Sequence, residues 1–181
     1  QLVAEDLGAG EISGFATSAI RDAPNGAAVI AEIAAATGVV LELLSGEDEA
    51  RLTFLAVRRW FGWSSGRLLV LDIGDGSLEL ATGADEEPDE AISVPLGAGR
   101  LTRTYCTADP PKPKQVRLMR KDARSQIAQV AGRLTRFGEP GVAVATSKTF
   151  RQLARVMGAA PSADGPYVRR IISRADLAEW L

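Results

Sequence analysis

The segment at residues 70–80, Val-Leu-Asp-Ile-Gly-Asp-Gly-Ser-Leu-Glu-Leu, constrains the fold of this chain more than any other. An apolar run leads into Asp72, Gly74 and Gly76 bracket a tight turn, and an alternating segment begins at Ser77. This pattern predicts a buried strand, a glycine turn and a second, antiparallel strand. The chain must therefore contain a β-sheet built around this hairpin.

The turn of the hairpin has two interpretations. In the first, it points backbone N–H groups into one concavity that cradles phosphate oxygens, and Asp72 and Glu79 hold a divalent cation beside the phosphate. In the second, Asp75-Gly76 is an ordinary hairpin turn with no ligand. The residues of the turn alone leave both open.

The composition excludes several kinds of active site. The chain has 181 residues, 46% apolar and 24% charged, which is typical of a globular protein of one domain or one and a half. It has no histidine, and Cys106 is its one cysteine. This excludes a disulfide framework, zinc sites of the Cys/His kind and Ser-His-Asp hydrolysis. Any catalysis must use carboxylates, Arg or Lys, hydroxyls, backbone amides or a hard metal ion.

Charge is divided unevenly between the two halves of the chain. Residues 1–99 carry 5 Lys or Arg and 17 Asp or Glu, whereas residues 100–181 carry 16 and 6. The halves either attract each other within one body or present a basic surface to a polyanion. A nucleic-acid partner is not expected, because no aromatic residues are interleaved with the basic ones.

No apolar run approaches the length of a membrane span, and the chain does not open with a charged and then apolar leader. We therefore expect a cytoplasmic protein with no membrane partner.

Apolar periodicity and capping residues predict the remaining elements. Ser45, for example, is placed to cap a helix that begins near Glu47. Strands are predicted at 14–19, 39–44, 67–73, 77–82, 91–95 and 142–145, and helices at 27–37, 47–60, 96–105, 116–137, 148–157 and 174–181.

The order β-β-β-α-β-α from residue 67 onward predicts an α/β layer like ribonuclease H and like one half of an actin-like ATPase. The earlier β-α-β stretch is interpreted as the end of a similar, preceding domain. The predicted organisation is a partial two-domain chain, with residues 1–45 as the C-terminal part of domain I and residues 46–181 as a truncated domain II.

Four segments in order carry a family resemblance. Each is weak alone, but the ordered set resembles the exopolyphosphatase / guanosine pentaphosphate phosphohydrolase (Ppx/GppA) family, in its actinobacterial branch. The segments are Ala-Thr-Ser-Ala-Ile-Arg-Asp-Ala-Pro-Asn at 16–25, Leu-Ser-Gly-Glu-Asp-Glu-Ala-Arg at 44–51, Leu-Asp-Ile-Gly-Asp-Gly-Ser-Leu-Glu at 71–79, and Pro-Leu-Gly-Ala-Gly-Arg-Leu-Thr at 95–102 with Asp-Pro-Pro at 109–111.

The resemblance implies an actin-like fold with an active site in the interdomain cleft, where a terminal phosphoanhydride is hydrolysed with the help of Mg²⁺. It implies that Glu49 is the general base and that Arg21 binds phosphate. It further implies that Gly74, Gly76 and Ser77 bind phosphate through the loop. Asp72 and Glu79 would lie beside the metal and the water. The implied partner is polyphosphate or guanosine penta- or tetraphosphate, and a homodimer is expected because family members often dimerise.

The residue types are also suited to phosphoanhydride hydrolysis when they are considered without the family. An arginine offers a planar fork to phosphate oxygens, and Mg²⁺ prefers one or two carboxylates plus substrate phosphates. Without histidine, a carboxylate must accept the proton of the attacking water. The residues alone also allow simpler roles. Arg21 could pair with Asp22 or a neighbouring acid, and Glu49 could stabilise its helix by placing a negative charge near the positive end of the helix dipole.

Two departures from the family pattern affect the expected activity. Asp75 stands where the family has the middle of three glycines. Its carboxylate is expected to face incoming phosphate and weaken binding, unless it turns outward or adopts a metal. The opening Asp-x-Gly-Ser-Asn loop of the family has no counterpart. We therefore expect this chain to be a fragment of a longer protein that alone hydrolyses no polyphosphate.

Two alternative functions remain at this point. Asp75 favours a catalytically impaired sensor that binds polyphosphate or guanosine tetraphosphate without cleaving it. An actin-like ATPase or a sugar or acetate kinase would share the phosphate-loop hairpin, but the Glu49-Ala50-Arg51 sequence argues against it.

Overall fold

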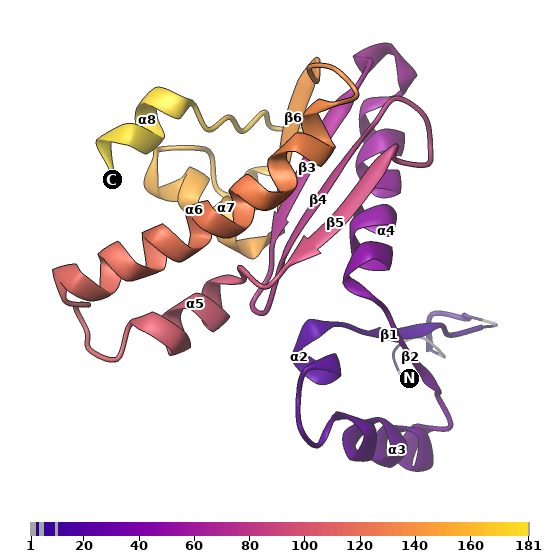
Figure 1. Ribbon diagram of the computed structural model, residues 1–181. Coiled ribbons are helices and arrows are strands. Elements are labelled where there is room, and N and C mark those ends of the chain that lie inside the picture. Colours follow the sequence, from indigo (N-terminus) through magenta and orange to yellow (C-terminus); the bar gives the residue numbers. More distant parts are fainter. Residues whose placement is uncertain (1–2, 4–5, 10, 181) are drawn as a thin grey trace.

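The computed structural model describes residues 3, 6–9 and 11–180, arranged as a small N-terminal unit below a larger α/β unit (Figure 1). In the smaller unit, β1 (Gly14–Ala16) and β2 (Leu41–Leu43) form a parallel pair. Helices α2 (Ser18–Arg21) and α3 (Gly26–Thr37) connect them. Gly38 ends α3 in the left-handed region at φ 72°, which glycine adopts without a Cβ penalty.

The larger unit is built on a four-stranded sheet with strand order β5-β4-β3-β6. The pairs β3–β4 and β4–β5 are antiparallel, and β6 joins the outer side of β3 in parallel. The strands are β3 (Leu68–Ile73), β4 (Leu78–Gly83), β5 (Glu90–Val94) and β6 (Val142–Thr146).

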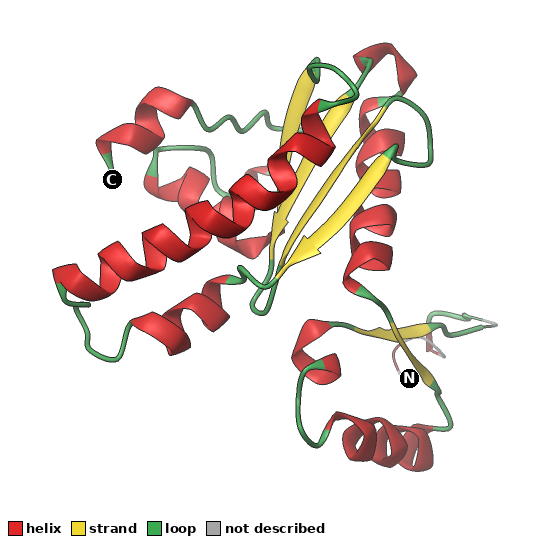
Figure 2. Ribbon diagram, viewed as in Figure 1, coloured by secondary structure: helices red, strands yellow, loops and turns green. Residues whose placement is uncertain are grey.

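Helices cover both faces of this sheet (Figure 2). Among the described residues, no helix is long and apolar enough to cross a membrane. The helices are α4 (Gly46–Phe61), α5 (Ala98–Tyr105), α6 (Pro113–Thr135), α7 (Ser147–Val156) and α8 (Arg174–Glu179), with short 3-10 turns at Trp63–Ser65 and Ser162–Asp164.

Two apolar clusters lie on opposite faces of the sheet because side chains alternate along each strand. One cluster joins Phe54 and neighbouring residues of α4 to Leu68 and Val70. The other joins Leu80 and Ile92 to α5 and α6. The sheet is therefore sandwiched, and its α4 face is the one that leads to the N-terminal unit.

The predicted helices and strands of the larger unit are confirmed, with ends displaced by a few residues. The largest displacement is at α6, which begins at Pro113 rather than at residue 116. Proline is favoured in the first turn of a helix because its missing N–H has no partner there. The Gln115 side chain also accepts from the Lys112 N–H at 2.8 Å, which closes this end of the helix.

The C-terminal end of α4 is fixed by a fully buried arginine. Arg58 is 0% exposed and uses all five of its N–H groups on neutral acceptors. These bonds join α4 to the turn that follows it and to the β4–β5 connection. The acceptors are the carbonyls of Gly62, Gly66, Gly83 and Asp85 and the hydroxyl of Ser65, at 2.8–3.3 Å.

We expect Arg58→Met to lower the free energy of unfolding by roughly 3–5 kcal/mol, because several buried carbonyls lose their donors together. Urea unfolding followed by circular dichroism measures this. Arg59→Met is the matched control, since Arg59 is exposed and makes one surface ion pair with Glu86 at 3.2 Å. That variant is expected to change stability by less than about 1 kcal/mol; equal losses in the two variants would contradict the role given to Arg58.

Candidate functional site

A row of four polar residues crosses the sheet at one end of the α4 face. Register places Ser93 opposite Glu79, Glu79 opposite Asp72, and Asp72 beside Thr146. The Ser93 hydroxyl donates to Glu79 Oε1 at 2.9 Å, and the Thr146 hydroxyl donates to the Asp72 carboxylate. One continuous line of hydrogen-bonding groups thus runs across β5, β4, β3 and β6.

The first turn of α4 brings a third carboxylate to this row. The Ser45 hydroxyl accepts from the Asp48 N–H at 3.1 Å and caps the helix, which starts α4 so that Glu49 faces the sheet. Glu49, Asp72 and Glu79 then line a single pocket of about 220 Å³. Its other lining residues are Thr17, Leu44, Leu52 and Thr53.

Arg21, in α2 of the N-terminal unit, does not line this pocket but contacts its Glu49. Its Nη1 donates to Glu49 Oε1 and to the Leu44 carbonyl, both at 2.6 Å, and its Nε lies 3.5 Å from Asp22 Oδ1. The simpler expectation that Arg21 pairs with a neighbouring acid is therefore confirmed as a contact. That acid is also the predicted catalytic residue, Glu49, so the pairing places the two predicted residues together.

The loop at residues 74–77 is held by the N-terminus of α5. The Ala98 N–H donates to the Gly74 carbonyl and the Arg100 N–H donates to the Asp75 carbonyl, both at 2.9 Å. In a trans peptide the next N–H points away from the carbonyl. The amides of Asp75 and Gly76 therefore point away from α5, and they make no hydrogen bond within the part of the chain that the structure describes.

The glycines of this region are required by close contacts rather than by unusual backbone angles. A Cβ at Gly76 would lie 2.8 Å from Ser18 Oγ of α2, and a Cβ at Gly97 would lie 2.3 Å from the Asp75 carbonyl oxygen. None of the loop residues is among the described residues with positive φ. The loop therefore fits closely between α2 and α5.

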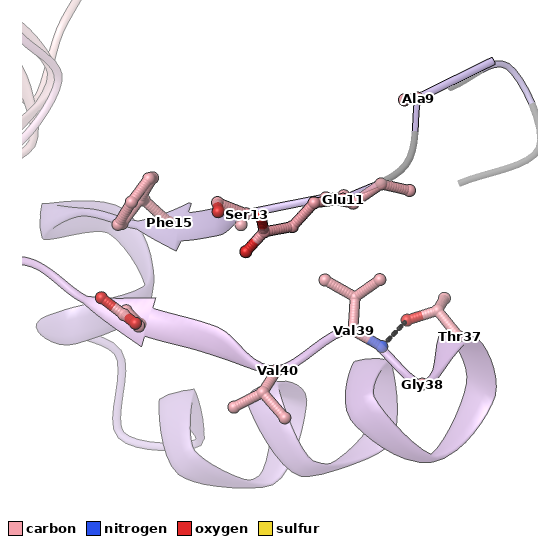
Figure 3. A pocket seen from close by; sticks show the side chains of 11 residues that line it. Ala9, Glu11, Ser13, Phe15, Thr37, Gly38, Val39 and Val40 are labelled. Atoms are coloured by element: carbon pink, nitrogen blue, oxygen red, sulfur yellow. Dashed lines mark hydrogen bonds between the residues drawn. The ribbon is translucent and has the colours of Figure 1, made fainter. Parts of the chain in front are cut away.

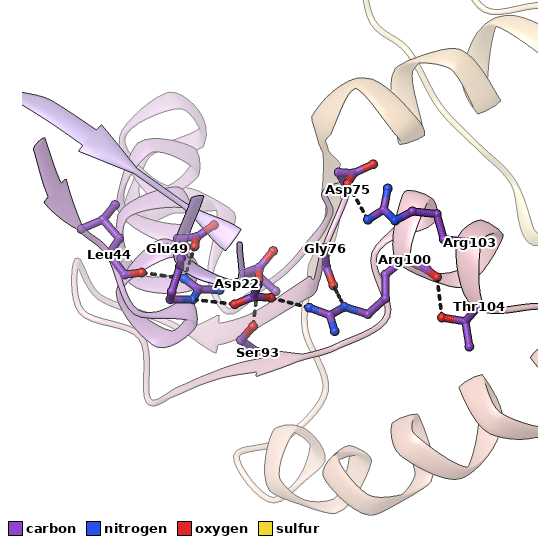
Figure 4. Close-up of polar contacts among 11 residues, drawn as sticks. Asp22, Leu44, Glu49, Asp75, Gly76, Ser93, Arg100, Arg103 and Thr104 are labelled. Carbon is purple, nitrogen blue, oxygen red and sulfur yellow. Dashed lines mark hydrogen bonds and ion pairs between the residues drawn. The ribbon is translucent and has the colours of Figure 1, made fainter. Parts of the chain in front are cut away.

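Asp75 is oriented by its contacts with α5. Its carboxylate turns outward against α5, where Arg103 Nη2 donates to Oδ2 at 3.0 Å (Figure 4). A Cβ at Gly99 would lie 1.8 Å from Asp75 Oδ1, so the glycine makes room for the carboxylate. Of the two orientations that the sequence left open, the structure shows the outward one, and it is set by residues of α5 that are distant in the sequence.

A second and larger hollow lies at the opposite ends of β1 and β2 (Figure 3). It measures about 480 Å³ and is lined by residues 9, 11–15, 37–40 and 42. Glu11 and Glu42 are its charged residues. It brings none of the predicted site residues together, so the smaller pocket is the candidate site.

One known family matches the whole length of the chain. The model described as "Ppx/GppA phosphatase family" matches residues 1–181. This chain belongs to the Ppx/GppA family. The predicted resemblance is thereby confirmed.

The curated relatives include actinobacterial proteins, as predicted. Exopolyphosphatase 1 of Mycobacterium tuberculosis is 52% identical over 179 residues, which are 99% of this chain and 52% of the relative. Exopolyphosphatase 1 of Mycobacterium leprae is 53% identical over 171 residues, which are 94% of this chain and 50% of the relative. The chain thus spans about half the length of the curated relatives it matches.

Solved structures of Ppx/GppA proteins share the fold. An exopolyphosphatase from Cytophaga hutchinsonii superimposes with a TM-score of 0.82 at 21% identity, covering 99% of this chain and 58% of that one. The Aquifex aeolicus family member gives 0.71 at 24% identity, covering 99% and 56%. The predicted actin-like ATPase architecture, mixed α/β, is therefore confirmed.

The structure of this Ppx/GppA chain adds residues to the site that the sequence analysis did not select. Thr146 and Ser93 orient the two strand carboxylates, and Arg100 contacts both the loop and α2. The predicted strands contain a signal for Ser93. Glu79 lies two residues after the start of strand 77–82 and Ser93 lies two residues before the end of strand 91–95, so antiparallel pairing would place them opposite each other. Thr146 is 74 residues from Asp72 and has no comparable local signal.

Burial raises the pKa of Glu79 above its ordinary value of 4.5; hydrogen bonds from Ser77 and Ser93 act in the opposite direction, and the charges of Glu49 and Asp72 raise it further. A group whose pKa is raised by folding binds a proton more readily in the folded state. Glu79 therefore destabilises the fold at neutral pH, and this loss shrinks as the pH falls toward 4.5.

We expect Glu79→Gln to raise the Tm at pH 7, because it removes a buried charge while an amide oxygen can still accept from Ser93. The difference in Tm between variant and parent should narrow as the pH falls toward 4.5. Calorimetry at several pH values measures both effects. Glu47→Gln, on the exposed side of the α4 first turn, is the control and should show no such pH dependence; a Glu79→Gln variant with an unchanged or lowered Tm at pH 7 would oppose this account.

Proposed function

We propose that this chain carries the phosphate-cleaving site of an exopolyphosphatase-type hydrolase, which releases the terminal phosphate of inorganic polyphosphate. One observation carries the proposal: Glu49, Asp72 and Glu79 line one pocket together, and Arg21 reaches Glu49 from the neighbouring unit. Inorganic polyphosphate is favoured over guanosine pentaphosphate as the substrate because the mycobacterial relatives are named exopolyphosphatases.

In the proposed complex, the loop and Arg21 bind the terminal phosphate. The Gly74 amide was also expected to bind phosphate, but its N–H donates to the Ser77 carbonyl at 2.9 Å and is not available. The amides of Asp75, Gly76 and Ser77 are the proposed donors without side-chain charge, and Arg21 supplies a positively charged fork. Arg21 uses Nη1 on Leu44 and Glu49 in the structure, so its Nη2 donors remain for phosphate oxygens.

Residues 1–45 and 46–181 are the proposed domains, and the proposed active-site cleft lies between them.

The donor set fits a divalent cation of the magnesium kind. Asp72 and Glu79 are cross-strand neighbours, and their hydrogen bonds to Thr146 and Ser93 leave other carboxylate oxygens available. No group of three or more metal-ligating side chains is assembled among the described residues. This is the pattern expected of Mg²⁺, which takes one or two carboxylates and completes its shell with water and substrate phosphates. When bound, the ion would neutralise phosphate charge.

Glu49 is the proposed general base. It is the carboxylate that faces the pocket from α4, opposite the two proposed metal ligands, so it can take a proton from water placed between them. The ion pair of Asp75 with Arg103 of α5 favours an active enzyme over an impaired sensor in this proposal. We further propose a cytoplasmic enzyme, acting as a homodimer without nucleic-acid or membrane partners.

We expect Glu49→Gln to lower kcat by about 10²–10⁴-fold while the protein still binds polyphosphate, because the amide cannot accept the water proton. Phosphate release is measured on the complete gene product with Mg²⁺. Glu47→Gln is the matched control from the same helical turn and should retain the parent rate. A Glu49→Gln variant with parent activity would reject Glu49 as the base.

The isolated 181-residue chain is expected to release no phosphate, because the opening loop of the family has no counterpart in it.

Asp75→Gly tests the orientation of the loop. Since the carboxylate points away from the proposed phosphate position, we expect kcat/KM for polyphosphate to change by less than about threefold, well under the cost of a dry like charge. Phosphate release over a range of polyphosphate concentrations measures it. A gain of a hundredfold or more would mean that Asp75 does face the substrate and that the protein is an impaired enzyme.

A further inference from the structure

Arg100 contacts the phosphate loop in a way that its neighbours do not. The Gly74 and Asp75 carbonyls are bound by backbone N–H groups of α5, which almost any residue could supply. The third carbonyl, that of Gly76, is bound by a side chain instead: Arg100 Nε donates to it at 2.7 Å. The Gly76 carbonyl is therefore the part of the loop whose direction depends on the identity of residue 100.

Fixing this carbonyl also fixes the direction of one amide. The Gly76–Ser77 peptide is trans, so the Ser77 N–H points opposite to the Gly76 carbonyl. With the carbonyl held toward α5, the Ser77 N–H is directed to the other side, like the amides of Asp75 and Gly76. Ser77 is itself 5% exposed and lies next to the strand that carries Glu79.

The same guanidinium reaches the N-terminal unit. Arg100 Nη2 forms an ion pair with Asp22 Oδ2, and the other oxygen of this carboxylate lies 3.5 Å from Arg21 Nε. Asp22 thus bridges two arginines, one that orients the loop and one that contacts Glu49 (Figure 4). Because Arg100 is 78 residues from Asp22, this bridge joins the two units and is not a local helix contact.

We propose that Arg100 is a positioning residue, which sets the direction of the Ser77 amide through the Gly76 carbonyl and, through Asp22, links Arg21 to the loop. Its guanidinium is suited to this because it is planar and binds two partners at fixed angles at once. A lysine has a single ammonium group and cannot hold both Gly76 and Asp22 in the same geometry. The effect on catalysis rests on the proposed function, whereas the effect on the Ser77 amide does not.

The first test measures the loop without ligand. Arg100→Met, Arg100→Lys and the control Arg59→Met, which removes a surface ion pair at the far end of α4, are compared by ¹⁵N relaxation of this chain. We expect the order parameter of the Ser77 amide to fall from the rigid range, about 0.85, to below about 0.6 in Arg100→Met. Arg100→Lys should give an intermediate value and Arg59→Met no change. An unaltered Ser77 order parameter in Arg100→Met would overturn the proposal; if that variant does not fold, Arg100→Lys decides it.

The second test measures kcat and KM for polyphosphate on the complete gene product. Arg100→Met should lower kcat/KM by up to about 10²-fold, at the low end of the cost of losing one donor, because the amide is misdirected rather than removed. Arg100→Lys should recover only part of this loss. An inactive parent combined with a loosened Ser77 amide would reject the proposed function and leave the positioning role standing. An active parent with unchanged kinetics and an unchanged amide in Arg100→Met would reject the positioning role alone.

Discussion

The docking of loop 74–77 onto the start of α5 is the interaction on which the site depends. The first N–H groups of a helix have no partner within the helix, and here two of them bind the loop carbonyls of Gly74 and Asp75. One set of hydrogen bonds therefore completes the helix end and turns the loop amides the other way. Gly97 is part of the same arrangement, because a side chain there would collide with the loop backbone.

The polar row on the sheet shows how the apolar core ends at the site. Along β3 the α4-facing residues run Leu68, Val70 and then Asp72, and on β4 Ala81 is followed on the same face by Glu79. Placing a carboxylate at the edge of a core raises its pKa and costs stability, as at Glu79. The cost is limited by hydroxyl donors from the two outer strands. The stability of the sheet alone does not explain two acids side by side, and the cation site proposed above does.

Local patterns in the sequence predicted the elements of the larger unit, including the hairpin that carries Asp72 and Glu79. A hairpin has a short loop, so the positions of its glycines determine which residues face each other across the two strands. The sequence pattern did not decide the direction of Asp75, which is set by Gly99 and Arg103, more than twenty residues away. It also failed to select Arg100 and Thr146. Their partners are brought close only by the packing of α5 on the loop and of β6 on β3, and apolar periodicity carries no information about either contact.

The position of Glu49 is fixed from the far end of its helix. Arg58 ties the last turns of α4 to the β4–β5 connection, while the first turn carries Glu49 to the pocket. A helix held in this way cannot rotate or slide without breaking buried hydrogen bonds, so Glu49 keeps its place relative to Asp72 and Glu79. Arg21 is held less firmly, because its unit meets the rest through a few polar contacts, at Glu49, at Asp22 with Arg100, and at Ser18 against Gly76. The firmly held part of the site therefore contains the carboxylates, and Arg21 is the part whose position relative to them depends on a few polar contacts.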